Sequence, residues 1–330
     1  MDYIESQTLS GHYDFINCIA VINKKTIASG SDDSSIKILD IISGKIIKTL
    51  YLYGACTCIA VINEDTLVSG DDGDSLIIWN FILGEKIKIL TRGGEFSCGG
   101  GCVGCPSCKW GGNTDDIVCV AMIDEKTIVS GSHANSLKIW NTETGKVIKK
   151  LIGHSDIVFC VIAIDENTIA SGSGDNSIKI WDVKSGKEIK TLIGHSEPIY
   201  CMAPINKNMF VSGGPDKFLK IWEVKTGKEI RTLIGHSDKI KCVVVSNENT
   251  IISGSQNNLL NIWEINSDKE AKTLTGHSKC VSCVAVSDEK TFISGSWDHS
   301  IKIWKSPPTL VKGFSQRDKN NSGCGGGGHK

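Results

Sequence analysis

The sequence predicts an all-β fold, a seven-bladed β-propeller of four-stranded antiparallel sheets. The first reason is a repeat, because tryptophans and histidines recur every 41 residues at Trp140, Trp181, Trp222, Trp263 and Trp304 and at His154, His195, His236 and His277. Two further units end at Leu39 and Trp79, and a 20-residue insertion follows Trp79, which gives seven units. The other reasons are short alternating runs within each unit and chain ends that complement each other. Such small sheets bury their apolar faces only by stacking on copies of themselves in a closed ring.

The fourth unit shows the four expected strands most clearly. Residues 157–164 are apolar and rich in β-branched side chains, while residues 168–173, 177–181 and 188–192 are short and alternate in polarity. Gly, Asn, Asp and Ser fill the breaks after each run, and these residues favour turns. No segment of ten residues has the 3.6-residue apolar period of a helix.

The two ends of the chain predict how the ring closes. After Trp304 come Lys305, Ser306 and two prolines, so the seventh unit has three strands and lacks a fourth. The segment Gln7–His12 matches Lys190–His195, which ends the fourth unit. We therefore expect residues around Ile4 to Leu9 to supply the missing strand of blade 7 and so to remove two open edges.

Composition and charge exclude several classes of protein. With 36 basic and 37 acidic residues the net charge is −1, which predicts neither direct nucleic-acid binding nor attraction to an anionic membrane. No uncharged apolar run approaches the roughly 18 residues that cross a bilayer, and the N-terminus does not read as a secretory signal. Fourteen cysteines in such a chain predict a reducing compartment, the cytoplasm, without excluding the nucleus.

With Gly-His near its start and Trp-Asp near its end, each unit resembles a Trp-Asp (WD) repeat, over roughly residues 4–305. The resemblance implies a buried hydrogen-bonded set of His, Ser, Asp and Trp within each blade. Matching residues are His154, Ser171, Asp175 and Trp181 in the fourth blade, His195, Ser212, Asp216 and Trp222 in the fifth, and His277, Ser294, Asp298 and Trp304 in the seventh. Ser, His and Asp also suggest a hydrolase, but a set that recurs is scaffold, so we expect no enzyme activity.

Several units depart from this pattern. Asn257 replaces the Asp in the sixth blade, and Leu39 replaces the Trp in the first. Gly73 and Ala134 stand at the Asp position of the second and third blades, which also lack the Gly-His histidine. We therefore expect blades 1 to 3 to be the less stable part of the ring.

Cysteines occur in two patterns. Seven recur on the first strand, where a small apolar side chain packs, at Cys18, Cys58, Cys119, Cys160, Cys201, Cys242 and Cys283. The insertion, at about 92–112, carries four more at Cys98, Cys102, Cys105 and Cys108. Four thiolates can hold zinc or an iron–sulfur cluster, and the alternatives are a reduced Cys/Gly-rich loop without a ligand or a redox disulfide. We expect no other cofactor, and a disordered polar tail over residues 306–330.

The function predicted from the scaffold is non-catalytic binding of a protein or peptide, by a monomeric propeller within a larger complex. Two sets of residues should surround the channel mouth on one face. The first set is the residue immediately before each repeated cysteine, and the second is the residue immediately before each turn Asp or its equivalent. The partner-binding candidates among them are Phe159, Tyr200, Trp297, Lys241, Asp32, Asp72 and His133. Aromatic rings beside acid suit a peptide with Lys or Arg, although the aromatic residues could instead only plug the channel.

Two other functions stay open. One is a metal- or redox-responsive module that uses the Cys98–Cys108 loop. The other is a ubiquitin-ligase substrate receptor, which the sequence supports less. Family members in that role often have Arg two residues after the Asp of Trp-Asp, where this chain has Lys184 in the fourth blade.

Overall fold

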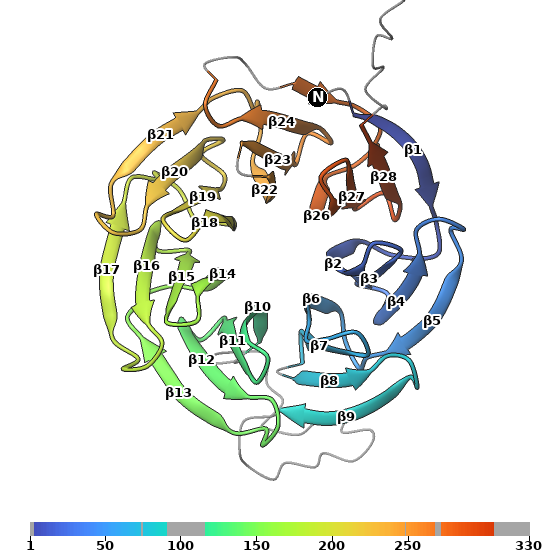
Figure 1. The fold of residues 1–330 in the computed structure, drawn as a ribbon, viewed down its shortest axis with the longest axis horizontal. Helices are drawn as coiled ribbons and strands as arrows, with labels where there is room; N and C mark the ends of the chain where they lie inside the picture. The colour runs from blue at the N-terminus through green and yellow to red at the C-terminus, as the bar shows by residue number, and fades with distance from the viewer. Residues whose placement is uncertain (1–2, 74, 91–115, 248, 268–271, 307–330) are drawn as a thin grey trace, which may run out of the picture.

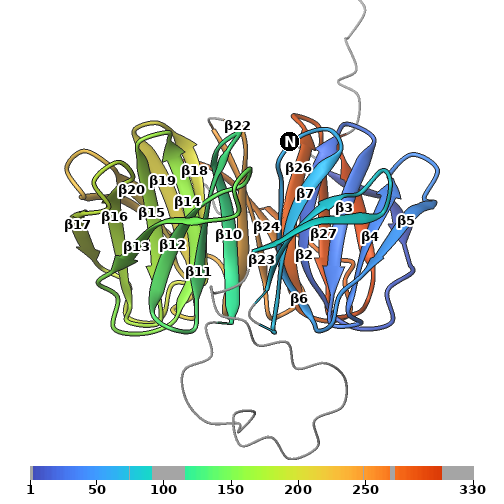
Figure 2. The same ribbon diagram turned by 90° about the horizontal axis from the view of Figure 1, so that it is seen from below.

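The computed structural model describes residues 3–73, 75–90, 116–247, 249–267 and 272–306. These residues form 28 strands in seven four-stranded sheets, arranged around a central axis (Figure 1). Seen from the side, the sheets stand next to one another as blades (Figure 2). The predicted seven-bladed β-propeller is therefore confirmed. In the part of the chain described, no helix is long and apolar enough to cross a membrane.

Each blade runs from an inner strand to an outer strand. The inner strands are β2 (Ile16–Asn23), β6 (Cys56–Val61), β10 (Ile117–Asp124), β14 (Val158–Asp165), β18 (Cys201–Asn206), β22 (Ile240–Asn247) and β26 (Val281–Asp288). The second strands are β3 (Thr26–Ser31), β7 (Thr66–Asp71), β11 (Thr127–Ser132), β15 (Thr168–Ser173), β19 (Met209–Gly213), β23 (Thr250–Ser255) and β27 (Thr291–Ser296). The third strands are β4 (Ser35–Asp40), β8 (Leu76–Asn80), β12 (Ser136–Asn141), β16 (Ser177–Asp182), β20 (Leu219–Glu223), β24 (Leu260–Glu264) and β28 (Ile301–Lys305). The outer strands are β5 (Ile46–Tyr51), β9 (Glu85–Leu90), β13 (Val147–Ile152), β17 (Glu188–Ile193), β21 (Glu229–Leu233), β25 (Lys272–Leu274) and β1 (Ile4–Leu9).

The N-terminal strand β1 completes blade 7, as the sequence predicts. It pairs antiparallel with β28, from Ile4 opposite Lys305 to Leu9 opposite Ile301. Lys302 Nζ lies 2.8 Å from Glu5 Oε1 and so adds an ion pair across this junction. Six blades therefore consist of consecutive strands, while the seventh joins the two ends of the described chain (Figure 1).

The apolar core lies between the blades rather than in one centre. Seven clusters of buried residues each span two consecutive blades. In one of them, Ile178 and Ile180 of blade 4 pack with Met202, Phe210 and Trp222 of blade 5. A chain of this length exceeds what a single core usually supports, and the repeated interfaces remove that limit.

The seven repeated cysteines pack where the inner ends of the blades are closest. Each lies opposite a glycine of the second strand, as Cys160 lies opposite Gly172. A Cβ on Gly172 would lie 2.8 Å from Cys160 Sγ and 2.5 Å from Ile199 Cγ2 of the next blade. Glycine and a small thiol therefore make room for the neighbouring blade. Burial raises the pKa of the Cys58 thiol to about 12, so this thiol stays protonated at neutral pH.

Candidate partner-binding face

One face of the ring carries the Gly-His turns together with the turns between the second and third strands. We call it the GH face. In blade 4 the His154 ring joins these two loops, because Nδ1 lies 2.8 Å from Asp175 Oδ2 and Nε2 lies 2.8 Å from Ser171 Oγ. The Trp181 indole N–H donates to the same Ser171 Oγ at 2.9 Å. These four residues are the set that the resemblance implied.

The donors and acceptors fix the protonation state of this set. The indole N–H of Trp181 can only donate, so the Ser171 hydroxyl accepts a hydrogen bond from it. The same hydroxyl donates its own hydrogen bond to Nε2 of His154. The imidazole proton then lies on Nδ1 and is donated to Asp175. Burial lowers the pKa of His154 and keeps the ring neutral. Burial alone would raise the pKa of Asp175, but hydrogen bonds from Ser177 and His154 bring it down to about 2.

The same geometry recurs in three other blades. In blade 5, His195 lies 2.6 Å from Asp216 and 2.7 Å from Ser212, which accepts from Trp222. In blade 7, His277 lies 2.9 Å from Asp298 and 2.7 Å from Ser294, which accepts from Trp304. Blade 1 has His12, Ser29 and Asp33 in the same contacts although Leu39 replaces the Trp. The Ser171, Ser212 and Ser294 side chains are fully buried, so a substrate cannot reach them.

The departures that the sequence shows leave gaps in these networks. In blade 6, where Asn257 replaces the Asp, His236 Nδ1 is buried and has no hydrogen-bond partner in the part of the structure described. In blade 3, where Ala134 replaces the Asp, Ser136 Oγ is likewise without a partner among the described residues. Blade 2 is different, because Asp71 accepts from the backbone N–H groups of Gly73 and Ser75 and so caps the turn from a new position.

A second repeated network was not found from the sequence. A Lys of the third strand contacts a Glu and a Thr of the outer strand: Lys179, Glu188 and Thr191 in blade 4, Lys220, Glu229 and Thr232 in blade 5, and Lys302, Glu5 and Thr8 in blade 7. The Lys Nζ to Glu Oε distances are 2.8, 2.9 and 2.8 Å. In the sequence, this network can be recognised from a Lys two residues before the Trp and a Glu three residues before a Thr.

Aromatic and lysine side chains of blades 4 to 7 and 1 form one continuous cluster on the GH face. Phe159 meets Tyr200 edge to face, with ring centroids 5.0 Å apart. Lys241 Nζ lies 4.5 Å from the centre of the Tyr200 ring and 5.6 Å from that of Trp297. Trp297 in turn stacks on Phe15 at 5.2 Å, and Lys279 Nζ lies 5.5 Å from the Phe15 ring centre. We call these six residues the aromatic–lysine cluster.

The cluster changes two parts of the sequence interpretation. Trp297, which the sequence predicts only as a partner-binding residue, stacks on Phe15, and Lys241 rather than a cation of the partner lies over the aromatic rings. Phe15 and Lys279 were missed. The signal for Phe15 is an aromatic residue three positions after the Gly-His histidine, where other blades have Ile157, Pro198, Lys239 and Cys280.

The polar candidates Asp32, Asp72 and His133 lie in turns of the same face. Asp32 Oδ1 accepts from Asn17 Nδ2 at 2.6 Å, and this Asn17 amide also donates to the Cys56 carbonyl at 3.1 Å. Asp72 and His133 are exposed, and each is fixed by its backbone N–H, to Ala55 O and to Asp116 O respectively. The Asp32 backbone N–H also donates to the Phe15 carbonyl at 2.9 Å, so Asp32 lies next to the end of the aromatic–lysine cluster. In the described residues no hydrogen bond or ring contact joins Asp72 or His133 to the cluster.

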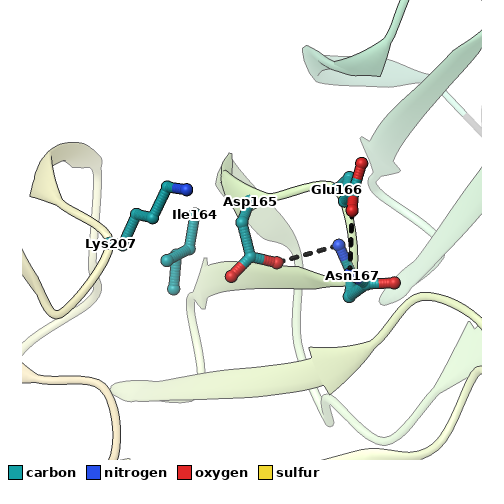
Figure 3. A pocket seen from close by; sticks show the side chains of 5 residues that line it. All are labelled: Ile164, Asp165, Glu166, Asn167 and Lys207. Carbon is teal, nitrogen blue, oxygen red and sulfur yellow. Dashed lines mark hydrogen bonds between the residues drawn. The ribbon is translucent and has the colours of Figure 1, made fainter.

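The opposite face carries the turns between the first and second strands. A polar hollow of about 440 Å³ lies at the first turn of blade 4 and is lined by Ile164, Asp165, Glu166, Asn167 and Lys207 (Figure 3). Asp165 accepts from the Asn167 backbone N–H at 2.8 Å, so its carboxylate serves the turn. We use this hollow below as a control surface.

The predicted metal site cannot be placed. Cys98, Cys102, Cys105 and Cys108 lie outside the described residues, and so does the predicted tail from residue 307 onward. Within the described ranges, no group of three or more His, Cys, Asp or Glu side chains could hold a metal ion.

Comparison with known proteins agrees with the repeat pattern. The family model described as WD domain, G-beta repeat matches residues 4–40, 145–182, 186–223, 227–264 and 268–305, more than half of the chain. No curated protein matches the chain. The matched segments carry the Gly-His and Trp positions of the networks described above, and the unmatched stretch 41–144 contains the departures of blades 2 and 3. The chain therefore belongs to the WD-repeat family, whose propellers are commonly protein-interaction scaffolds and typically non-catalytic.

Proposed function

We propose that this propeller is a non-catalytic scaffold that binds a protein or peptide across the GH face, centred on the aromatic–lysine cluster. The observation that carries the proposal is the continuous contact from Phe159 through Tyr200, Lys241 and Trp297 to Phe15, made by partly exposed side chains of five blades. Trp and Tyr are enriched among the residues that dominate the energy of protein–protein binding. We place this function in the cytoplasm, as the cysteine content predicts.

The charges indicate how a partner would lie. Lys241 occupies the space over the Tyr200 and Trp297 rings, so a Lys or Arg of the partner would have to displace it. An acidic group of the partner instead finds the ammonium groups of Lys241 and Lys279, which have no carboxylate within ion-pair distance in the described part of the chain. Basic groups of the same partner fit the side that carries Asp32 and Asp72. Complementary charges of this kind set orientation and association rate more than total affinity.

The test is affinity purification with the full chain, followed by mass spectrometry. Phe159→Ala, Tyr200→Ala and Trp297→Ala are compared with Glu166→Ala and Lys207→Ala, which change the hollow on the opposite face. We expect the first three variants to lose specific partners at least tenfold and the two control variants to retain them. Thermal melting of every variant verifies that it is folded. Unchanged partner capture by folded cluster variants would contradict the proposed face.

Charge variants separate the two sides of the face. Lys241→Gln should weaken capture of the same partners and reduce its dependence on salt, because one charged contact is lost. Asp32→Asn with Asp72→Asn should weaken capture only of partners with basic segments. If neither change affects any partner that the aromatic variants lose, the face binds through apolar contact alone.

A further inference from the structure

One cysteine outside the repeated set breaks the pattern of the inner strands. Cys56 opens β6 at a position where the six other blades have a β-branched apolar residue, Ile16, Ile117, Val158, Ile199, Ile240 or Val281. Its neighbour across the blade interface is Cys18 of β2, a member of the repeated set. The substitution thus places a second thiol next to the first, at the interface between blades 1 and 2.

The two sulfur atoms are in contact. Cys18 Sγ lies 3.9 Å from Cys56 Sγ, and both lie next to Gly30 of β3. A Cβ on Gly30 would lie 2.7 Å from Cys18 Sγ and 2.4 Å from Cys56 Sγ, so the glycine provides the space that both thiols occupy. Cys56 is fully buried, whereas Cys18 is partly exposed. Of the two residues, Cys18 is therefore the one closer to solvent.

We propose that Cys18 and Cys56 are a modification site, a thiol pair that hydrogen peroxide converts into a disulfide between blades 1 and 2. In the first step the Cys18 sulfur attacks one oxygen of hydrogen peroxide, and the O–O bond breaks. The released hydroxide takes up the Cys18 thiol proton and leaves as water, and Cys18 becomes a sulfenic acid. In the second step Cys56 sulfur attacks Cys18 sulfur, the S–O bond breaks, and the second water leaves with the Cys56 proton. Two thiols are oxidised and one peroxide is reduced to two waters, so atoms and electrons balance.

The surroundings favour a disulfide over a bound metal ion. The pair is packed with apolar residues of both blades, among them Ala28, Leu52 and Ile59. The hydrogen bond to Cys56 and burial raise the pKa of Cys18 well above its usual range, so thiolate ligands are disfavoured here. A disulfide carries no charge and suits this environment. The same raised pKa makes the first step slow, so sustained exposure to peroxide is required.

The cross-link would join two blades whose networks are incomplete. Blade 1 lacks the Trp, and blade 2 lacks the Gly-His histidine. A covalent bond between β2 and β6 restricts the unfolded chain and holds the interface together. Oxidation should therefore raise the unfolding temperature by several degrees.

The experiment uses the full-length reduced protein and a time course with hydrogen peroxide. The reaction is stopped in acid, free thiols are alkylated in denaturant, and peptides are mapped by mass spectrometry without reduction. We expect a Cys18–Cys56 linked peptide to appear and to disappear on treatment with dithiothreitol. The matched control is Cys56→Val, which carries the type of residue found in the other blades while the cysteines of the insertion still react.

The unfolding temperature is a second measurement, which does not depend on how much linked peptide is recovered. The unfolding temperature should rise on oxidation in the wild type and return on reduction, and this reversible rise should be absent from Cys56→Val. The proposal fails if Cys18 and Cys56 are both recovered as alkylated thiols after the insertion cysteines have been oxidised. It also fails if Cys18 is found linked to another cysteine or if the temperature shift persists in Cys56→Val.

Discussion

Blade 6 contains a vacant hydrogen-bonding position that a single substitution should fill. His236 Nε2 is bonded to Ser253 Oγ at 2.7 Å, but its buried Nδ1 has no partner among the described residues. In blades 1, 4, 5 and 7 a turn Asp oxygen lies between 2.6 and 2.9 Å from the corresponding Nδ1. Asn257→Asp places a carboxylate at this position and should stabilise the protein.

The expected gain follows from the bonds made and lost. A buried polar atom without a partner costs roughly 1–3 kcal/mol, and a new bond to a charged acceptor removes that cost. The substitution gives up the exposed bond from Asn257 Nδ2 to Ser237 Oγ, which is 2.7 Å long and contributes roughly 0.5–1 kcal/mol. The net gain in unfolding free energy at neutral pH should be about 1–2 kcal/mol.

The gain should also depend on pH in a defined direction. Burial lowers the pKa of His236 from 6.5 to about 4. Between these values the unfolded chain binds a proton that the folded protein does not, so wild-type stability falls as pH falls from 6.5 to 4, by on the order of 3 kcal/mol. A carboxylate beside Nδ1 raises the folded-state pKa of His236 and reduces this loss. Asn257→Asp should therefore exceed the wild type by more at pH 5 than at pH 7.5.

The measurement is urea unfolding of wild type, Asn257→Asp, His236→Ala and the double variant at both pH values. The gain should vanish in the His236→Ala background, because the carboxylate then has no imidazole to accept from. If Asn257→Asp stabilises both backgrounds equally, the effect comes from the turn and not from His236. If it stabilises neither, an unpartnered Nδ1 is not costly in this blade.

Three shorter predictions concern the scaffold. Glu5→Ala should lower the unfolding temperature by a few degrees because it breaks the ion pair that fastens β1, and Ile4→Ala, at an exposed position, should change it less. Gly214→Ala should destabilise by more than about 3 kcal/mol, since its Cβ would lie 2.1 Å from the Pro198 carbonyl oxygen, whereas Gly73→Ala should be tolerated. Glu188→Ala should cost roughly 1–3 kcal/mol by leaving the Lys179 ammonium, on a mostly buried side chain, without its carboxylate, and Lys179→Met in addition should recover most of this. Thermal melting measures the first change, and chemical denaturation measures the other two.

Much of the fold could be predicted because every unit repeats the same Trp position and the same pattern of short alternating strands. The 41-residue spacing of Trp140 to Trp304 gives five blades, and the units that end at Leu39 and Trp79 bring the number to seven. The alternating runs of the fourth unit lie within a residue of β14 to β17. Closure by Ile4–Leu9 was also predictable, because an unpaired strand at one end matched a missing strand at the other.

The site could be predicted only in part, because it depends on contacts between different blades. The repeat places Phe159 and Tyr200 at equivalent positions of adjacent blades, and so predicts that they are close. It does not predict that Lys241 bends over Tyr200 and Trp297, since the rotamer of a long side chain depends on what stands beside it. Phe15 escaped notice because its position in other blades holds unrelated residues.

The blades that depart most from the repeat show which parts of the pattern maintain the ring. Residues 41–144 lie between matched segments of the family model, yet β6 to β9 and β10 to β13 form complete four-stranded sheets. In both blades the Trp still donates to the strand Ser, at 2.9 Å in each case, from Trp79 to Ser69 and from Trp140 to Ser130. What these blades lose are the His and Asp that join the loops of the GH face. Blade 1 shows the reverse loss, because it lacks the Trp and keeps the His12–Asp33 bond. Strand pairing and the Trp–Ser bond therefore suffice for blades 2 and 3, and the loss of the His–Asp bond there changes the loops of the GH face without opening the ring.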